Sequence, residues 1–272
     1  MERDQRAHWS SVYAGRPDYF GAGPSALAYR AVELFKRNGC HEVLELGCRQ
    51  GRDTYHFARE GFRVIALDCS ETGVCQMRER AKGLCLEPVV EVLCHDLRAG
   101  IPLRDGSVDA VHSHMLFTME LWERDLVHPG RVPVGAEAGG AEHVLGPQRP
   151  RPPLRQGPAQ GEDMWEGPNG FVVHYFSEEK VRRLARGYDV VHIMEFDDPS
   201  PLVTKKLYEV LLRRPCSDRA ADKVADHERG QPDQGHPQPL PPRVPFAQAA
   251  HDEPGDEQQD YGERDGRLDR SY

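Results

Sequence analysis

Strand-like and helix-like segments alternate along this chain, and their order restricts its fold more than any other feature. Between residues 25 and 117, short apolar runs typical of buried strands, such as EVLEL and RVIALD, alternate with segments whose apolar residues recur at helical spacing. Several of the helical segments follow a Ser cap and end at a Gly. Strand–helix–strand repeats of this length predict a parallel sheet with helices on both faces. The chain is therefore expected to form a doubly wound α/β fold.

The segment after residue 170 continues the pattern with a different ending. The run FVVHYF is followed by a helical segment, SEEKVRRLARG, and then by two strand-like runs, DVVHIMEF and KKLYEVLLRR. Only the short stretch DDPSPLVT joins these two runs, which is too little for a crossover helix. They are predicted to form a C-terminal antiparallel strand pair.

Composition and charge limit the compartment and the partners. There are 7 cysteines, an odd number without any C-x-x-C pair, so reduced cysteines and a cytoplasmic location are expected. No apolar run is long enough to span a membrane, and the N-terminus lacks the apolar core of a secretory signal. The formal net charge is −9, but residues 215–272 hold 7 Lys and Arg against 13 Asp and Glu. The rest of the chain is nearly balanced, which argues only weakly against nucleic acid.

A glycine-containing loop follows the first predicted strand at LELGCRQGRD. Gly47 and Gly51 would let the backbone approach a ligand closely, and the next helix offers free N–H groups at its start. Asp68 ends the next strand, where a carboxylate can accept hydrogen bonds from both ribose hydroxyls. Asp96 and Leu97 follow the third strand and suit the amino group and flat face of an adenine. These residues fall at the carboxyl ends of successive strands, where open α/β sheets bind ligands.

The spacing within this loop separates two classes of nucleotide cofactor. A dinucleotide fingerprint G-x-G-x-x-G starting at Gly47 would need glycines at positions 49 and 52, and both are Arg. The spacing of Glu45, Gly47 and Gly51 instead resembles the first motif of class I S-adenosylmethionine-dependent methyltransferases. The resemblance extends through VIALDCS, HDL and VDAVHSHMLF and resumes at GEDMWEGPNGFVVHYFSEEKV, so it covers residues 8–121 and 161–214. Within that class it is similar to small-molecule enzymes of the tellurite-resistance and thiopurine-methylating kind.

The resemblance implies a function and a set of site residues. It implies a Rossmann-like fold, S-adenosyl-L-methionine as the cofactor, and methyl transfer to a small-molecule acceptor without nucleic acid or membrane partners. The implied cofactor-binding residues are Glu45, Gly47, Arg49, Gly51, Asp68, Asp96 and Leu97. Glu45 would order the loop and help to hold the amino group of the methionine moiety. Asp68 would bind the ribose, and Asp96 with Leu97 would contact the adenine. Because the methyl group is displaced directly, no catalytic residue stands out.

Arg49 departs from this pattern, since the family has Gly in its place. If the position needs a positive φ, an arginine costs about 1–2 kcal/mol of strain. The side chain also starts where the cofactor should lie. The guanidinium could block the loop, turn outward or pair with the cofactor carboxylate. The alternative to an active enzyme is therefore a degenerate, non-catalytic methyltransferase-fold protein with impaired cofactor binding.

Residues 122–160 do not continue the α/β pattern. They hold 7 Pro, 6 Gly and 5 Arg, and prolines at 147, 150, 152 and 153 oppose a helix or a central strand. The family has its fifth, central strand in this place, so that strand is predicted to be garbled. The composition fits GC-rich coding sequence read out of frame, which suggests a pair of compensating frameshifts. A genomic read without an insertion or deletion across these codons would contradict that hypothesis.

Several of these residues also have a purely structural interpretation. Asp68 and Asp96 could cap helices or turns. His112, His114 and His174 are too isolated in sequence for a metal site, and His114 is better explained as a pocket wall. The aromatic-rich stretch HWSSVYAGRPDYF could close over the cofactor or pack against the domain. The stretch GEDMWEG could contact the substrate or form a loop.

The expected domain organisation follows from these segments. Residues 1–24 form an N-terminal lid segment. Residues 25–214 form the methyltransferase domain, in which 122–160 is an irregular insert. Residues 215–272 are rich in Pro, Asp and Gln, a composition typical of a disordered tail.

Overall fold

The computed structural model describes residues 5–16, 18–21, 23–116, 141–148, 159–161, 163–166, 172–198 and 205–215. All of them belong to one compact unit that spans Met1–Ala225. The predicted disordered tail lies outside the described residues, except for Pro215. None of the described helices combines the length and the apolar character needed to cross a membrane.

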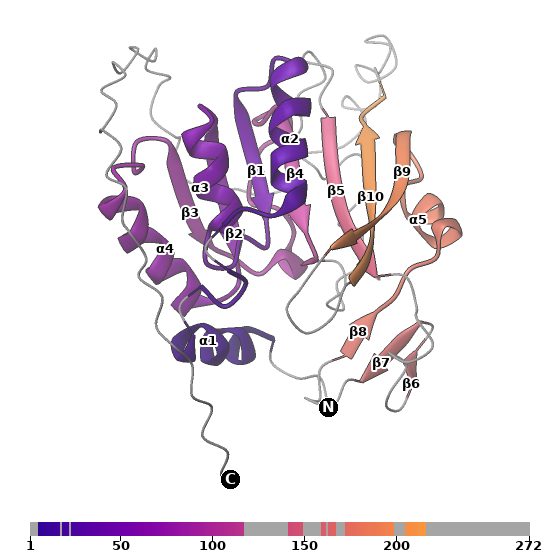
Figure 1. The fold of residues 1–272 in the computed structure, drawn as a ribbon, viewed down its shortest axis with the longest axis horizontal. Helices are drawn as coiled ribbons and strands as arrows, with labels where there is room; N and C mark the ends of the chain where they lie inside the picture. The colour runs from indigo at the N-terminus through magenta and orange to yellow at the C-terminus, as the bar shows by residue number, and fades with distance from the viewer. Residues whose placement is uncertain are drawn as a thin grey trace, which may run out of the picture. The chain divides into compact units, whose positions relative to one another are not determined.

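A seven-stranded sheet forms the centre of the described chain, in the order β3-β2-β1-β4-β5-β10-β9 (Figure 1). Its strands are β1 (Glu42–Leu46), β2 (Arg63–Asp68), β3 (Val90–Cys94), β4 (Ala110–His114), β5 (Ala141–Gln148), β9 (Asp189–Asp198) and β10 (Lys205–Arg213). The strands from β3 to β5 run parallel, and β10 pairs antiparallel with both β5 and β9. The predictions of a doubly wound, mostly parallel sheet and of a C-terminal antiparallel pair are confirmed.

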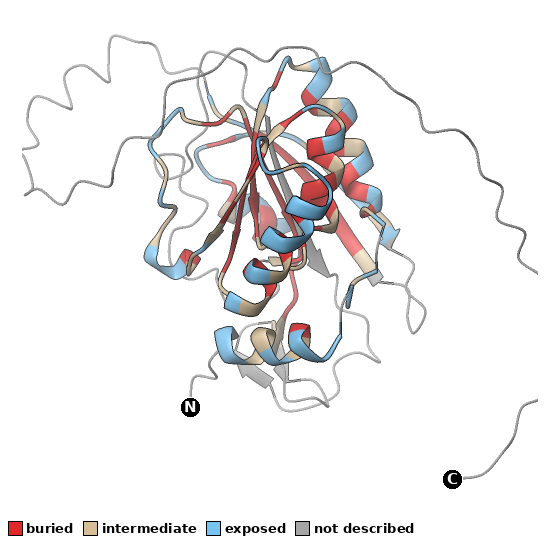
Figure 2. Cartoon of the chain, turned by 90° about the vertical axis from the view of Figure 1, so that its left-hand side faces the viewer, coloured by how far each residue is buried: buried red, intermediate tan, exposed pale blue. Residues whose placement is uncertain are grey.

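Helices lie on both faces of this sheet. The described helices are α1 (Gln5–Gly15), α2 (Ala26–Arg37), α3 (Arg52–Arg59), α4 (Glu71–Gly83), the short 3-10 helix η1 (Leu97–Ala99) and α5 (Glu178–Leu184). Apolar residues of α2, α3 and α4 pack with Val43 of β1 in one core cluster, whereas residues of η1 and α5 pack with Leu44 in another. Alternate strand residues therefore face opposite cores, and nearly all of β1 and β2 is buried (Figure 2).

Side-chain caps determine where three of the helices begin. The hydroxyls of Ser25, Ser70 and Ser177 accept hydrogen bonds from the third N–H group of α2, α4 and α5, as their sequence positions predict. Helix α3 begins differently, at Gly51 in the left-handed conformation with φ 84°. The start of α3 therefore depends on the glycine of the loop rather than on a polar cap.

The prediction that the fifth strand is garbled is wrong for residues 141–148. They form β5, which pairs in parallel with β4 and antiparallel with β10 and so fills the place between them. Backbone hydrogen bonds make this pairing, so a lack of apolar periodicity does not prevent it. The ladder with β10 is irregular opposite Gly146 and Pro147, and such irregular positions tolerate a proline. Residues 122–140 and 149–158 lie outside the described residues.

A small antiparallel sheet lies beyond the carboxyl ends of the parallel strands, where Figure 1 also shows α1. It consists of β6 (Ala159–Gly161), β7 (Met164–Glu166) and β8 (Val172–His174). The GEDMWEG stretch, for which a loop was one interpretation, contains β7. Its Asp163 has φ 60°, and the Asp163 carbonyl accepts the Tyr175 N–H at 2.8 Å.

Candidate functional site

The loop between β1 and α3 has a shape that requires glycine at two positions. Gly47 and Gly51 have positive φ, at 72° and 84°, a region that side chains rarely adopt. A Cβ on Gly47 would lie 2.9 Å from Leu116 Cδ1, and one on Gly51 would lie 2.8 Å from Met77 Cε. The Gly47 N–H also donates to the Leu67 carbonyl at 2.8 Å and ties the loop to the end of β2. Both glycines are therefore structural requirements of the loop.

Asp68 ends β2 with its carboxylate bound to the backbone of neighbouring loops. One oxygen accepts the Arg49 N–H at 2.9 Å, and the other accepts the Ser70 N–H at 2.9 Å. Burial raises the pKa of Asp68 above its usual value, and these two hydrogen bonds oppose the rise. Asp68 thus makes the capping contacts of the structural interpretation. Each oxygen keeps a further lone pair, which a ligand hydroxyl could use.

Glu45 lies in β1 with its carboxyl group buried against the start of α3. The Thr54 hydroxyl donates to Glu45 Oε2 at 2.5 Å, so this side chain joins β1 to α3. Burial, followed by the charge of Asp53, raises the pKa of Glu45 to about 8. The carboxyl group is therefore largely protonated at neutral pH. Its contact with Thr54 agrees with a role in ordering the loop.

Asp96 and Leu97 follow β3, next to the His95 N–H that donates to the Asp68 carbonyl at 2.9 Å. Asp96 Oδ1 accepts the Arg98 N–H at 3.0 Å and caps η1, and Arg98 Nη2 donates to Oδ2 at 2.7 Å. The bond from the Arg98 side chain lowers the pKa of Asp96 below its usual value. Leu97 is buried in the core beneath. An adenine contact by Asp96 would therefore compete with Arg98.

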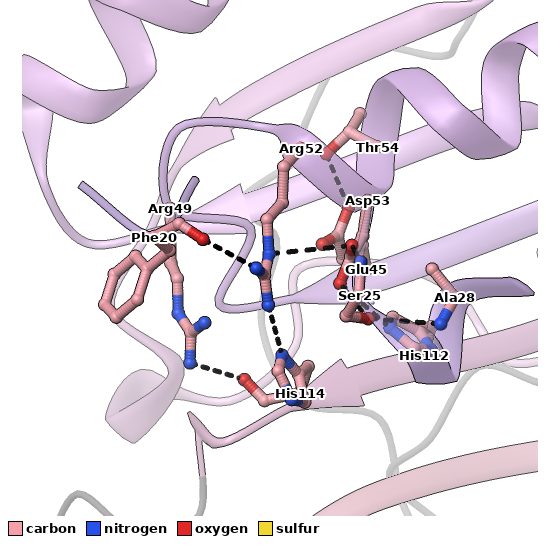
Figure 3. A network of polar contacts seen from close by, with 10 residues as sticks. All are labelled: Phe20, Ser25, Ala28, Glu45, Arg49, Arg52, Asp53, Thr54, His112 and His114. Carbon is pink, nitrogen blue, oxygen red and sulfur yellow. Dashed lines mark hydrogen bonds and ion pairs between the residues drawn. The ribbon is translucent and has the colours of Figure 1, made fainter. Parts of the chain in front are cut away.

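Two arginines of the loop join the N-terminal segment to the end of β4 (Figure 3). Arg49 donates from Nη2 to the His114 carbonyl at 2.7 Å, and its Cζ lies 4.1 Å from the centroid of the Phe20 ring. Arg52 donates from Nη1 to the Phe20 carbonyl at 2.7 Å, and its Nη2 lies 3.2 Å from His114 Nδ1. Each arginine therefore contacts both Phe20 and His114. We call these four residues the arginine clamp.

The arginine clamp decides between the interpretations of Arg49. Its φ is 59°, so the positive φ expected at this position is present. The guanidinium is buried and points from the loop toward His114, so the alternative of an outward-turned side chain is wrong (Figure 3). Burial lowers the pKa of Arg49 below its usual value.

Asp53 forms a buried network that the sequence analysis missed. Its Oδ1 accepts the Ser25 N–H at 2.6 Å, and its Oδ2 accepts the Ser25 hydroxyl at 2.9 Å. Arg52 Nε and His112 Nε2 lie 3.7 and 3.6 Å from the same carboxylate. Burial raises the pKa of Asp53, but the hydrogen bond from His112 and the positive groups of His112, His114 and Arg52 outweigh it and hold the pKa below its usual range. The network joins the starts of α2 and α3 to β4.

The N-terminal segment packs over the loop and α4. The hydroxyls of Ser10 and Ser70 are 3.0 Å apart, and Gln76 donates to the Tyr13 carbonyl at 3.0 Å. The Tyr19 N–H donates to the side chain of Gln50 in the loop at 2.8 Å. These contacts are the packing that one interpretation of the aromatic-rich stretch predicted. Its role as a lid stays a prediction.

The three singled-out histidines lie in two places. His112 and His114 belong to the networks around Asp53 and Arg52, and His114 at the end of β4 adjoins the loop as a wall. His174 Nε2 lies 2.7 Å from Lys180 Nζ. Burial, followed by the charge of Lys180, lowers the pKa of His174 to about 4. Within the described residues, no group of His, Cys, Asp and Glu is arranged to hold a metal ion.

Comparison with known proteins assigns the domain. A family model described as "Methyltransferase domain" matches residues 43–128, from β1 to beyond β4. The chain carries a class I methyltransferase domain. The 18S rRNA (guanine(1575)-N(7))-methyltransferase of Saccharomyces cerevisiae is 33% identical to it over 88 residues, which are 32% of this chain and 30% of that protein. The match thus spans less than a third of that relative's length.

Solved structures resemble a larger part of this methyltransferase chain. A structure described as "Conversion of a Disulfide Bond into a Thioacetal Group during Echinomycin Biosynthesis" is 20% identical, with a TM-score of 0.57, over 82% of this chain and 98% of that chain. The 1,6-didemethyltoxoflavin-N1-methyltransferase of Burkholderia thailandensis, with bound 1,6-didemethyltoxoflavin and S-adenosylhomocysteine, is 17% identical, with a TM-score of 0.55, over 77% and 86%. These likenesses confirm the Rossmann-like fold, and S-adenosylmethionine is the cofactor of the family.

The residues of the site fit one part of this cofactor better than another. The glycine loop and the carboxylates of Asp68 and Asp96 are the groups that a ribose and an adenine require. The Arg49 side chain does not fit, because its guanidinium fills the space between the loop and the His114 carbonyl. Leu116 lies against Gly47 on the same loop. A cofactor can therefore share this loop only if Arg49 moves.

Proposed function

We propose that this protein transfers a methyl group from S-adenosyl-L-methionine to a small-molecule acceptor. The observation that carries the proposal is the Asp68 carboxylate, held by backbone N–H groups at the end of β2 beside the glycine loop. A glycine loop after one strand and an acid after the next form the arrangement that binds a ribose in open α/β sheets. The family model covers both elements.

The chain's own residues would bind and orient the reactants. When bound, S-adenosylmethionine supplies a methyl group on a sulfonium, which a nucleophile can displace directly. Asp68 would accept hydrogen bonds from the ribose hydroxyls, and Asp96 with Leu97 would contact the adenine. Glu45 would keep the loop in place through Thr54. The contribution of such a site to the rate comes from positioning and from the exclusion of water.

A small molecule is the acceptor that the comparisons and the charge favour. The toxoflavin enzyme and the echinomycin study concern small molecules, whereas the yeast relative acts on rRNA. Apart from residues 215–272, the chain is nearly balanced in charge, whereas nucleic-acid binding depends on an excess of positive charge. We therefore propose neither nucleic acid nor membrane as a partner. The described cysteines are free, which supports a reducing cytoplasm.

A second candidate is a non-catalytic protein with a methyltransferase fold. The buried Arg49 guanidinium favours this candidate, because it occupies space beside the loop that binds the cofactor in the first. The two candidates differ in one measurable property. A methyltransferase binds S-adenosylhomocysteine, the product form of its cofactor, and the degenerate protein does not.

A thermal-shift titration with S-adenosylhomocysteine tests the proposal. Under the first candidate, a ligand at 100 times its Kd should raise Tm by about 5–10 °C for a domain of this size. Asp68→Asn removes the charge that would receive the ribose hydroxyls and should weaken binding by about 10- to 100-fold. Asp105→Asn, at an exposed position, is the matched control and should bind like the wild type. The absence of any shift in the wild type would favour the second candidate, and full affinity in Asp68→Asn would contradict the ribose assignment.

A further inference from the structure

Arg49 is held by two kinds of group that recognise organic cations in general. The His114 carbonyl accepts its hydrogen bond at 2.7 Å, and the face of the Phe20 ring lies 4.1 Å from its Cζ. A carbonyl oxygen accepts hydrogen bonds from any N–H cation, and an aromatic face attracts ammonium, sulfonium and guanidinium groups alike. The contacts are therefore selective for a positive charge rather than for an arginine.

The conformation of Arg49 is unfavourable without these contacts. Its φ of 59° lies in a region that residues other than glycine rarely adopt. Its guanidinium is removed from water, which disfavours the charged form. The attraction that Phe20 and His114 exert on a cation is what offsets both penalties.

The two contacting groups are held in place independently of Arg49. Arg52 donates to the Phe20 carbonyl at 2.7 Å, and its Nη2 lies 3.2 Å from His114 Nδ1. Arg52 Nε in turn lies 3.7 Å from the buried carboxylate of Asp53. Removal of the Arg49 side chain is therefore expected to leave the ring and the carbonyl in position.

We infer that the Phe20 ring and the His114 carbonyl form a binding site for a small organic cation, and that Arg49 is its internal occupant. The ligand class is an ammonium or sulfonium group. S-adenosylmethionine carries both, an identification that rests on the proposed function. Its cationic end enters this site when the Arg49 side chain leaves, so Arg49 competes with the cofactor from within the same chain. The competition weakens cofactor binding without abolishing it.

Methylguanidinium tests the cation site without the cofactor. Arg49→Ala removes the occupant but keeps a Cβ at the same φ, so backbone strain is matched. Millimolar methylguanidinium chloride should raise the Tm of this variant by about 2–4 °C and then reach a plateau, whereas NaCl at equal ionic strength should not. The wild type, in which Arg49 fills the site, and the double variant Arg49→Ala/Phe20→Leu should show no saturable rise. Arg182→Ala, which removes an exposed guanidinium beside Glu178, is the control.

Each result of this experiment bears on the cation site. A saturable rise confined to Arg49→Ala supports it. No rise in that variant, or an equal rise in the double variant or in Arg182→Ala, overturns it. Should Arg49→Ala fail to fold, Arg49→Gly replaces it, because glycine adopts a positive φ without strain.

Titration with S-adenosylhomocysteine, which carries the ammonium group, separates this inference from the proposed function. Arg49→Ala should bind it at least about tenfold more tightly than the wild type, because no internal cation has to be displaced. Equal affinity of the two proteins would overturn the competition by Arg49. If neither protein binds it while methylguanidinium stabilises Arg49→Ala, the cation site stands and the proposed function falls.

Discussion

Replacement of Asp53 by alanine is expected to lower the free energy of unfolding by about 3–5 kcal/mol, the loss typical of a buried charge network that loses one member. The Asp53 carboxylate accepts the N–H and the hydroxyl of Ser25 at 2.6 and 2.9 Å. Its other neighbours are Arg52 and His112. Alanine would leave the Ser25 donors without their acceptor and Arg52 without its counter-charge. It would also release the Ser25 hydroxyl that caps α2.

Denaturant unfolding of the variant and the wild type at neutral pH measures this loss. Asp53→Asn keeps the volume and one acceptor oxygen, so its loss should be smaller than that of alanine. Asp105→Ala, at an exposed position, should change the free energy of unfolding by no more than about 0.5 kcal/mol. A loss below about 1 kcal/mol in Asp53→Ala would show that water replaces the carboxylate, as it does at partly exposed sites.

Asp53 also marks the limit of what its local sequence reveals. An acidic residue in the first turn of a helix is expected from the helix dipole alone. Its binding partner Ser25 lies 28 positions earlier. No local pattern distinguishes an exposed acid at this point of a helix from one that joins two helices. The same holds for Arg49, whose direction is set by Phe20 in the N-terminal segment and by His114, 65 positions later.

The features that the sequence predicts correctly are those with local causes. The apolar runs of β1 and β2 need burial on both faces, and the Ser caps act within one helical turn. Strand β5 has no such local cause. Its place is set by the open edges of β4 and β10, which a chain of weak strand propensity can fill through its backbone. The contact between Asp96 and Arg98 is local as well, and it agrees with the cap considered from the sequence.

Exchange of Glu45 for glutamine is expected to remove a pH dependence from the stability of the wild type. In the folded chain, burial and the charge of Asp53 raise the pKa of Glu45 from its usual value of 4.5 to about 8. Between these two pH values the folded state holds a proton that the unfolded state has released. The free energy of unfolding of the wild type should therefore fall as pH rises through this window, by up to about 1.4 kcal/mol per pH unit, and level off above it.

Glutamine is the suitable substitute because it resembles the protonated carboxyl group and its oxygen can still accept the Thr54 hydroxyl. Urea unfolding of both proteins across this window gives the difference between their free energies of unfolding, from which groups that titrate alike in both proteins cancel. Glu45→Gln should gain stability relative to the wild type as pH rises, whereas parallel curves would show that Glu45 is already ionised at the acid end. Asp53→Asn removes the second cause of the raised pKa, so in that background the gain of Glu45→Gln should level off at a lower pH. A window unchanged by Asp53→Asn would mean that burial alone keeps the Glu45 proton in place.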